Sequence, residues 1–343
     1  MVNFLFNFGT ILFFIVCNIC SAVAQETRAS MSNIEISSTD SVIYFAYAQK
    51  QASTIFKLDI PTSKLTKLSR PVPGIIKRIS LTQNEERILC AYAEVINGSY
   101  SNSVASYSIG ESHLTKLFEV KAILMDVTQS RNDKELLLLL AGNFGKSSPF
   151  VNPRSRAMNI YSYIFDSLQL RPETDLSTYE ITGKLKLEDK KDNIYFNVTF
   201  LPKQSNSLQN DGPYRYNINS KSLEYLTPKN MDQLQPDIKR NADIKRHFTR
   251  FLTPIASIYN TSLYYLHDVH NIYQVNSQTL MGRAIPYRQN PEKQSGILAI
   301  RNIVAMHKSN SLVLLINNKS KYFLRILKEN GQQEDIEINS SIF

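Results

Sequence analysis

The stretch Val42 to Leu68, VIYFAYAQKQASTIFKLDIPTSKLTKL, decides the fold because degraded copies of it recur along the chain. It begins with an apolar run and a polar turn, continues with a second run from Ile55 to Ile60, and ends with a short third run after Pro61. Branched and aromatic residues in short runs, bounded by Pro, Ser, Asp and Asn, are typical of strands joined by tight turns. The stretch therefore predicts a β-hairpin followed by a third strand.

Copies of the second and third runs can be aligned with the first stretch. Val104 to Leu117 matches Ile55 to Leu68 without a gap at an offset of 49, and Tyr214 to Thr227 matches Phe56 to Ser69 at an offset of 158. Looser copies lie at Ile160 to Leu170, Ile272 to Leu280 and Tyr322 to Ile336. The recurrence indicates one structural unit repeated along the chain.

An apolar strand precedes each copy, and these strands begin at residues 43, 88, 136, 194, 263 and 312. A period of about 40 to 50 residues with only strands is typical of propeller blades. We therefore expect an all-β fold, a β-propeller of six four-stranded blades with longer insertions in the fourth and fifth. A seventh, more degenerate blade within residues 201–250 is the alternative.

Two local predictions complete this architecture. A blade has two apolar faces, so blades must stack until no face remains open. We expect the ring to close by strand exchange between the termini, with Glu26 to Ser37 or Ile336 to Phe343 completing a blade. Lys184 to Asp192, KLKLEDKKD, is charged enough for a short helix, but its alternation favours a β-hairpin.

The run IYF, a turn, IFKLD, LTKL and then ISLTQNEERILCAY resembles the WD40-like, or PD40, repeats of the TolB-type β-propeller family. The resemblance covers essentially all residues after position 24 and implies the propeller fold. In that family the turn before the innermost hairpin usually reads Ser-Pro-Asp-Gly, whereas here it reads, for example, Thr82-Gln83-Asn84-Glu85. The resemblance therefore implies no particular functional residues.

The first 24 residues, MVNFLFNFGTILFFIVCNICSAVA, contain no charged side chain and end in Ala22-Val23-Ala24. An apolar run before a small-residue motif is typical of a secretory signal with its cleavage site. We expect a signal peptide at 1–24, a single propeller domain at 25–343, and a periplasmic or secreted location. An uncleaved membrane anchor is the alternative, because about 20 apolar residues can span a bilayer.

Cys90 is the sole cysteine after residue 24, so we expect no intrachain disulfide. It lies in the apolar run Ile88 to Tyr92, where a buried small hydrophobe is the expected role and a nucleophile is not. Cys17 and Cys20 raise the option of a lipoprotein, but neither follows the small residue that normally precedes a lipidated cysteine.

The chain has 39 basic and 30 acidic residues, a formal net charge of +9. An exported chain this basic is expected to bind an acidic protein partner or an acidic envelope polymer, and not nucleic acid. We expect a monomer whose membrane association is only peripheral unless the signal remains uncleaved. The densest basic cluster is the candidate partner-binding site, with a solvated loop as the alternative: Lys239, Arg240, Lys245, Arg246 and Arg250.

Few residues suggest chemistry, since the chain has no Gly-rich phosphate loop and no Gly-x-Ser-x-Gly elbow. His267, Asp268 and His270 are candidate metal ligands if a hairpin turn brings them together, with an exposed polar loop as the alternative. Asp126, Asp166 and Glu180 are expected at strand ends, as turn formers or as carboxylates facing a central channel. We expect no cofactor.

Two functions fit these observations. The first is an exported propeller that binds a protein or an envelope polymer through one rim, without catalysis. The second is a propeller hydrolase or lyase that acts on a carbohydrate or lactone in the central channel. An enzyme of this kind needs several carboxylates or histidines from different blades to meet near the ring axis.

Overall fold

The computed structural model describes fourteen segments of the chain: 29–96, 99–130, 134–141, 158–174, 179–187, 192–200, 212–226, 229, 255–259, 262–266, 271–276, 278–286, 299–318 and 321–338. Within these segments all regular elements are strands. None of the described segments contains a helix long and apolar enough to cross a membrane.

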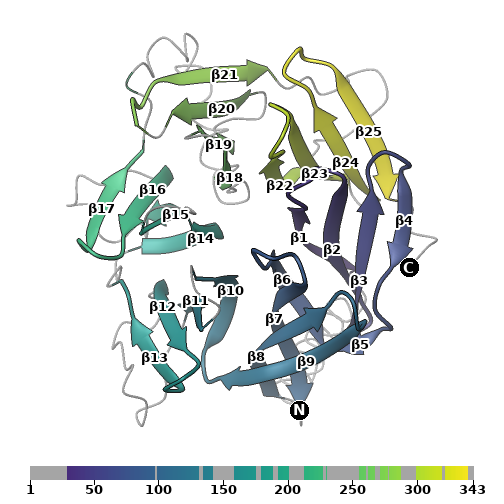
Figure 1. Ribbon diagram of the computed structural model, residues 1–343, viewed down its shortest axis with the longest axis vertical. Helices are drawn as coiled ribbons and strands as arrows, with labels where there is room; N and C mark the ends of the chain where they lie inside the picture. The colour runs from purple at the N-terminus through teal and green to yellow at the C-terminus, as the bar shows by residue number, and fades with distance from the viewer. Residues whose placement is uncertain are drawn as a thin grey trace, which may run out of the picture.

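The strands form six antiparallel sheets arranged around a centre, and consecutive strands of the chain make up each sheet (Figure 1). Blade 1 contains β1 (Ser30–Ile36), β2 (Val42–Gln49), β3 (Ala52–Asp59), β4 (Lys64–Lys67) and the short β5 (Val72–Pro73) beside β3. Blade 2 contains β6 (Ile75–Leu81), β7 (Arg87–Ile96), β8 (Ser99–Ser108) and β9 (His113–Val120). Blade 3 contains β10 (Ile123–Gln129), β11 (Glu135–Ala141), β12 (Met158–Ile164) and β13 (Gln169–Pro172).

The second half of the ring repeats the same order. Blade 4 contains β14 (Tyr179–Leu187), β15 (Asn193–Phe200), β16 (Gly212–Asn217) and β17 (Ser222–Tyr225). Blade 5 contains β18 (Ile255–Tyr259), β19 (Ser262–Leu266), β20 (Asn271–Asn276) and β21 (Gly282–Pro286). Blade 6 contains β22 (Ala299–Ala305), β23 (Leu312–Asn318), β24 (Lys321–Leu327) and β25 (Gln333–Ile338).

This arrangement confirms the all-β propeller with four-stranded blades. The quoted stretch forms β2, β3 and β4, and its aligned copies fall on the corresponding third and fourth strands of the other blades, except that Ile272 to Leu280 ends before β21. The six sheets account for all the strands of the described segments. Of the stretch Lys184 to Asp192, residues 184–187 lie in β14, which pairs antiparallel with β15, and residues 188–191 lie outside the described segments.

Each innermost strand carries a bulge or irregularity against its neighbour. The register shifts in β1, β6, β10, β14, β18 and β22 alike, and these six strands lie nearest the centre of Figure 1. A bulge increases local twist and turns side chains out of their regular alternation. The bulges therefore allow inner-strand side chains to reach the next blade.

The expected closure by strand exchange is wrong for the described residues. The strand β1 is the innermost strand of blade 1 and β25 is the outermost of blade 6, so both terminal blades are complete without a strand from the other end. Residues 26–28 and 339–343, which belong to the same prediction, lie outside the described segments. Because neither blade lacks a strand, side-chain contacts between blades 6 and 1 must close the ring.

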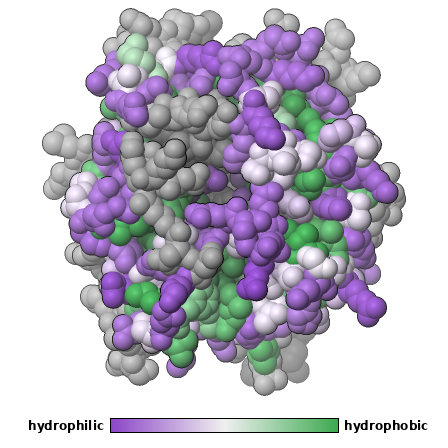
Figure 2. Space-filling model, in the orientation of Figure 1, coloured by the Kyte–Doolittle hydropathy of each residue, from purple (hydrophilic) through white to green (hydrophobic). Residues whose placement is uncertain are grey.

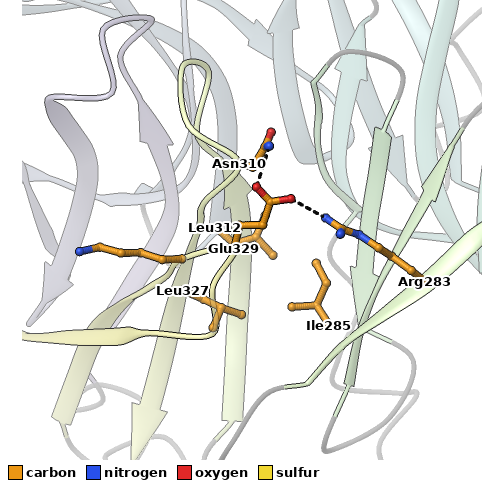
Figure 3. A pocket seen from close by; sticks show the side chains of 7 residues that line it. Arg283, Ile285, Asn310, Leu312, Leu327 and Glu329 are labelled. Atoms are coloured by element: carbon orange, nitrogen blue, oxygen red, sulfur yellow. Dashed lines mark hydrogen bonds and ion pairs between the residues drawn. The ribbon is translucent and has the colours of Figure 1, made fainter.

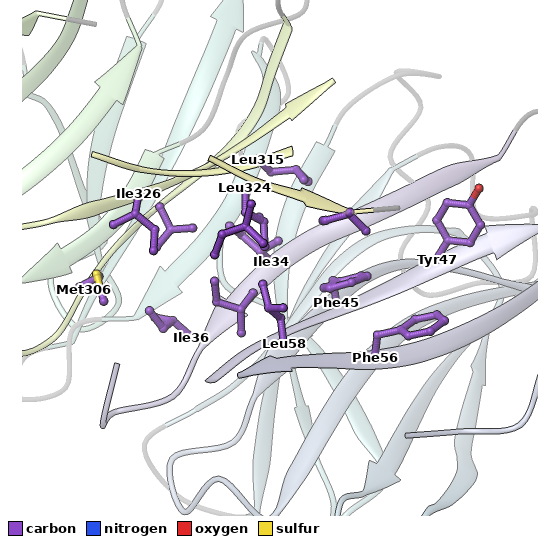
Figure 4. Close-up of a cluster of buried hydrophobic side chains, with 14 residues drawn as sticks. Ile34, Ile36, Phe45, Tyr47, Phe56, Leu58, Met306, Leu315, Leu324 and Ile326 are labelled. Carbon is purple, nitrogen blue, oxygen red and sulfur yellow. The ribbon is translucent and has the colours of Figure 1, made fainter. Parts of the chain in front are cut away.

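An apolar cluster fills the contact between the last and the first blade (Figure 4). Ile34, Phe45 and Leu58 of blade 1 belong to the same buried cluster as Leu315 and Leu324 of blade 6. Burying one such side chain stabilises a fold by about 1.5–3 kcal/mol. Since the cluster has fourteen buried members, apolar packing is a sufficient reason for closure.

A carboxylate adds a polar contact at the same junction. Asp40, in the turn between β1 and β2, accepts hydrogen bonds from the backbone N–H groups of His307, Lys308 and Ser309 in the turn between β22 and β23. Hydrogen bonds to a charged acceptor are stronger than neutral ones. The two turns that flank the junction are therefore tied together.

We expect Leu324→Ala to lower the free energy of unfolding by about 2–5 kcal/mol, because it opens a cavity in the closing cluster. Met281→Ala is the control, since Met281 is 52% exposed and its truncation should change stability by less than about 0.5 kcal/mol. Urea unfolding followed by circular dichroism measures both. Equal midpoints for the two variants would show that the cluster does not hold the ring closed.

Candidate functional site

The residues proposed from the sequence as a metal site and as a partner site fall outside the described segments. These are His267, Asp268 and His270, and the basic cluster Lys239, Arg240, Lys245, Arg246 and Arg250. Within the described segments, no three His, Cys, Asp or Glu side chains gather as a metal site requires. Candidate sites must therefore be built from other residues.

Cys90 is a buried core residue, which confirms its expected role. It has no exposed surface and belongs to the apolar cluster between blades 1 and 2. Burial raises the pKa of its thiol to about 12. A thiol with so high a pKa stays protonated at neutral pH and is a poor nucleophile.

The three carboxylates considered from the sequence lie in different surroundings. Asp166 is an exposed turn residue that pairs with Lys134, Oδ2 to Nζ at 2.9 Å. Glu180 is the second residue of β14, at the end of the strand as expected, and pairs with Thr199 of β15. Asp126 lies inside β10 and is fully buried, so its expected place at a strand end is wrong. Asp166 and Glu180 therefore lie near strand ends, and Asp126 does not.

One position on the inner strands links blade 6 to blade 1, blade 1 to blade 2, and blade 3 to blade 4. After the bulge in four of these strands comes a buried aliphatic residue, and we call the residue just before it the bulge position. The residues at this position are Asn33, Arg78, Asp126 and Asn302. Asn302 Oδ1 accepts the N–H of Ile34 in blade 1 at 3.3 Å. Asn33 then pairs with Ile79 of blade 2 in both directions, accepting its N–H at 2.8 Å and donating to its carbonyl at 2.9 Å.

Arg78 interrupts this series, because a guanidinium has no acceptor to offer the next blade. The N–H of Val127 is instead accepted by Oδ1 of the adjoining Asp126 at 2.9 Å. Oδ2 of Asp126 accepts the N–H of Leu185 in blade 4 at 2.7 Å. Asp126 thus serves two backbone donors, one in its own blade and one in the next.

Burial raises the pKa of Asp126 to about 7, and the Arg78 charge and the two N–H donors oppose this rise only in part. A carboxyl group with such a pKa suits acid–base chemistry. Both of its oxygens are already bound to backbone N–H groups, however, so the geometry assigns Asp126 to holding blades 3 and 4 together.

The raised pKa predicts a pH dependence of stability. The folded protein keeps the Asp126 proton up to about pH 7, whereas the unfolded chain loses it near pH 3.8. The Asp126 contribution to the free energy of unfolding therefore falls as pH rises between these values. We expect Asp126→Asn to remove this downward slope, measured as the urea midpoint from pH 4 to pH 8. The exposed Asp166→Asn should retain it, and identical slopes in the wild type and Asp126→Asn would contradict the assignment.

A pocket of about 100 Å³ lies between blades 5 and 6 (Figure 3). Its apolar lining comes from Ile285 of β21, Leu312 at the start of β23 and Leu327 at the end of β24. The polar lining comes from Arg283 of β21 and from the blade 6 turns: Asn310, Lys328 and Glu329. Leu312 and Leu327 are only 1% exposed, so they form a firm apolar wall.

Glu329 is the central polar group of this pocket, with Arg283 and Asn310 on either side of its carboxylate (Figure 3). Asn310 Nδ2 donates to Oε2 at 2.9 Å, and Arg283 Nη2 lies 3.4 Å from Oε1. The Asn310 hydrogen bond, followed by the Arg283 contact, lowers the pKa of Glu329 and keeps it charged at neutral pH. The pocket therefore presents a fixed negative and a fixed positive group at one opening.

Sequence reasoning missed this pocket because no local motif marks it. Arg283 and Glu329 are 46 positions apart and belong to different blades. They meet only because the ring places the outer strand of blade 5 beside a turn of blade 6. The blade repeat predicts that these two segments lie in neighbouring blades. It carries no information on the residue types at positions 283 and 329.

Solved structures with the same architecture include the TolB protein of Acinetobacter baumannii, with a TM-score of 0.50 and 11% identity over 76% of this chain. The chain spans 55% of that TolB protein. An oligogalacturonate lyase in complex with manganese has a TM-score of 0.52 and 10% identity, covering 89% of this chain and 77% of the lyase. An acylaminoacyl peptidase has a TM-score of 0.51 and 13% identity, covering 91% of this chain and 46% of the peptidase.

These similarities confirm the β-propeller fold and, at such low identity, the fold alone. No protein-family model matches the sequence, and no curated protein matches it either. The neighbours include both TolB and enzymes, so the function must be argued from the residues of this chain.

Proposed function

We propose that this propeller is an exported, non-catalytic binding module for an acidic partner, a protein or an envelope polymer. In this proposal residues 1–24 are a signal peptide, and residues 25–343 act in the periplasm or outside the cell as a divergent member of the TolB-type propellers. The basic net charge of +9 and the resemblance of the repeats support the proposal.

The observation that carries the proposal is the charge distribution on blade 1. We call Lys50, Lys57, Lys64, Lys67 and Arg70 the blade 1 basic edge. All five lie on β3, β4 and the turns beside them, and the single acid among them is Asp59. Hydrogen bonds from Thr62, with smaller effects of Lys57 and Lys64, lower the pKa of Asp59. Four of the five cations are exposed and Lys57 is half-buried, so the edge offers a positive surface to solvent.

Several acidic side chains elsewhere bind groups of the same chain. Asp40 binds three backbone N–H groups, and the buried Glu173 binds Ser162 and Lys221. Glu224 pairs with Arg215, and Asp335 pairs in a bidentate manner with Arg325. These four carboxylates therefore have partners other than the blade 1 basic edge.

Such a surface favours acidic partners over others. Exposed charges of one sign accelerate association with molecules of opposite charge and set the salt dependence of binding. The lysines of β4 also lie on an edge strand, where they disfavour pairing with a second copy of the sheet. This agrees with the proposed monomer.

The competing function is a hydrolase or lyase with its site in the channel. The neutral-range pKa of Asp126 is the observation that favours it. Against it, both oxygens of Asp126 bind backbone N–H groups. On the face shown in Figure 2, the described residues beside the centre of the ring are mostly hydrophilic. Binding through the basic surface is therefore the function that we propose.

Charge reversal tests the proposal. We expect the mature chain, residues 25–343, to capture a defined partner from an envelope extract at about 150 mM salt, where the screening length is about 8 Å. The triple variant Lys57→Glu, Lys64→Glu and Lys67→Glu should lose that capture. A matched triple variant at exposed sites of other blades, Lys121→Glu, Arg171→Glu and Lys308→Glu, should keep it.

The two variants have the same net charge, because each substitution removes two positive charges from the wild-type +9. Equal loss of capture would mean that only the total charge matters. A third matched variant, Lys239→Glu, Arg240→Glu and Lys245→Glu, tests the cluster proposed from the sequence. Turnover of a carbohydrate or lactone by the purified chain would contradict the non-catalytic assignment.

A further inference from the structure

The pocket between blades 5 and 6 combines an apolar wall with two opposite charges at one opening. Ile285, Leu312 and Leu327 come from three different strands and offer only aliphatic carbon to a ligand. Moving a methylene group from water onto such a surface is favourable. The wall therefore suits an alkyl group.

The charges at the opening restrict the ligand further. Arg283 suits a carboxylate, and Glu329 suits an ammonium group. Their closest charged atoms lie 3.4 Å apart, which is too close for two separate ligands. A single ligand that uses both must carry a carboxylate and an ammonium group on neighbouring atoms, with the alkyl group beyond them. An α-amino acid has this arrangement.

Separating the Arg283–Glu329 ion pair costs little free energy. Both side chains are more than half exposed, at 56% and 52%, and exposed ion pairs add little to stability. Each group also has a second partner that holds it in place. Asn310 binds the carboxylate of Glu329, and Gln274 accepts a hydrogen bond from Nε of Arg283. These second partners hold the two charged groups at the opening after the pair separates to admit a ligand.

The volume sets the size of the ligand. A pocket of about 100 Å³ is smaller than the roughly 150 Å³ cavity that holds benzene. It therefore accommodates a branched alkyl group of three or four carbons, while the charged end of the ligand stays at the opening. We propose that this pocket binds a free aliphatic amino acid of valine or leucine size. This inference is independent of the proposed binding of an acidic partner.

Ligands that lack one part each test the inference. Isothermal titration of the mature chain compares L-leucine with 4-methylpentanoate, which lacks the ammonium group, with 3-methylbutylamine, which lacks the carboxylate, and with glycine, which lacks the alkyl group. We expect leucine to bind about tenfold or more tightly than 4-methylpentanoate and 3-methylbutylamine, since a hydrogen bond to a charged group is worth about that factor or more. Leucine should also bind more tightly than glycine, which buries no alkyl group. Equal affinity for leucine and 4-methylpentanoate would overturn the inference, as would no heat from leucine at millimolar concentration.

Two variants assign the charges. Glu329→Gln should weaken leucine about tenfold or more and leave 4-methylpentanoate unchanged or tighter, because Arg283 loses its competing carboxylate. Arg283→Gln should weaken leucine and 4-methylpentanoate and spare 3-methylbutylamine. Glu334→Gln, an exposed residue of β25 with the same charge change, is the control. Unaltered leucine affinity in Glu329→Gln would overturn the assignment, and urea unfolding verifies that each variant is folded.

Discussion

Packing of each blade against two neighbours is the constraint on which this molecule depends. The central strands are apolar on both sides, because each face covers a different neighbour. In β11, Leu137 and Leu139 belong to the cluster shared with blade 4, whereas Leu136, Leu138 and Leu140 belong to the cluster shared with blade 2. In β2, Phe45 faces blade 6 and Ala46 faces blade 2. A blade with one open face would leave such residues in water, so the chain must form a ring.

Polar groups then fix the relative position of neighbouring blades, which apolar packing alone does not determine. At the inner strands, the bulge position supplies a hydrogen-bond acceptor to the backbone of the next blade, as Asn33 does for Ile79. At one rim, side chains of one turn bind the backbone of the neighbouring turn: Asp40 binds Ser309, Glu85 binds Ser38, and Gln129 binds Gln83. Apolar packing is not directional, whereas these bonds are. They therefore set how far each blade rotates against the next.

The parts of this fold that the sequence predicts are those set by local pattern. The strands β2 and β3 follow from branched and aromatic runs separated by turns, and the blade period follows from their recurrence. Ring closure did not follow, because the pattern of strands is the same whether a blade is continuous or split between the termini. The contacts of Asp40 with Ser309 and of Arg283 with Glu329 join residues far apart in the chain, and no local pattern encodes them.

The bulge position shows why such a fold diverges so far in sequence. Asparagine, arginine and aspartate occupy it in different blades, and what the fold requires is that the backbone N–H of the next strand finds an acceptor. Because Arg78 of blade 2 supplies none, the N–H of Val127 is accepted by Asp126 of its own strand. Many sequences meet so general a requirement, which agrees with identities of 10–13% to propellers of the same architecture. The outer strands and turns are under fewer structural constraints. The blade 1 basic edge and the pocket between blades 5 and 6 lie there, where residue types can vary with the ligand that is bound.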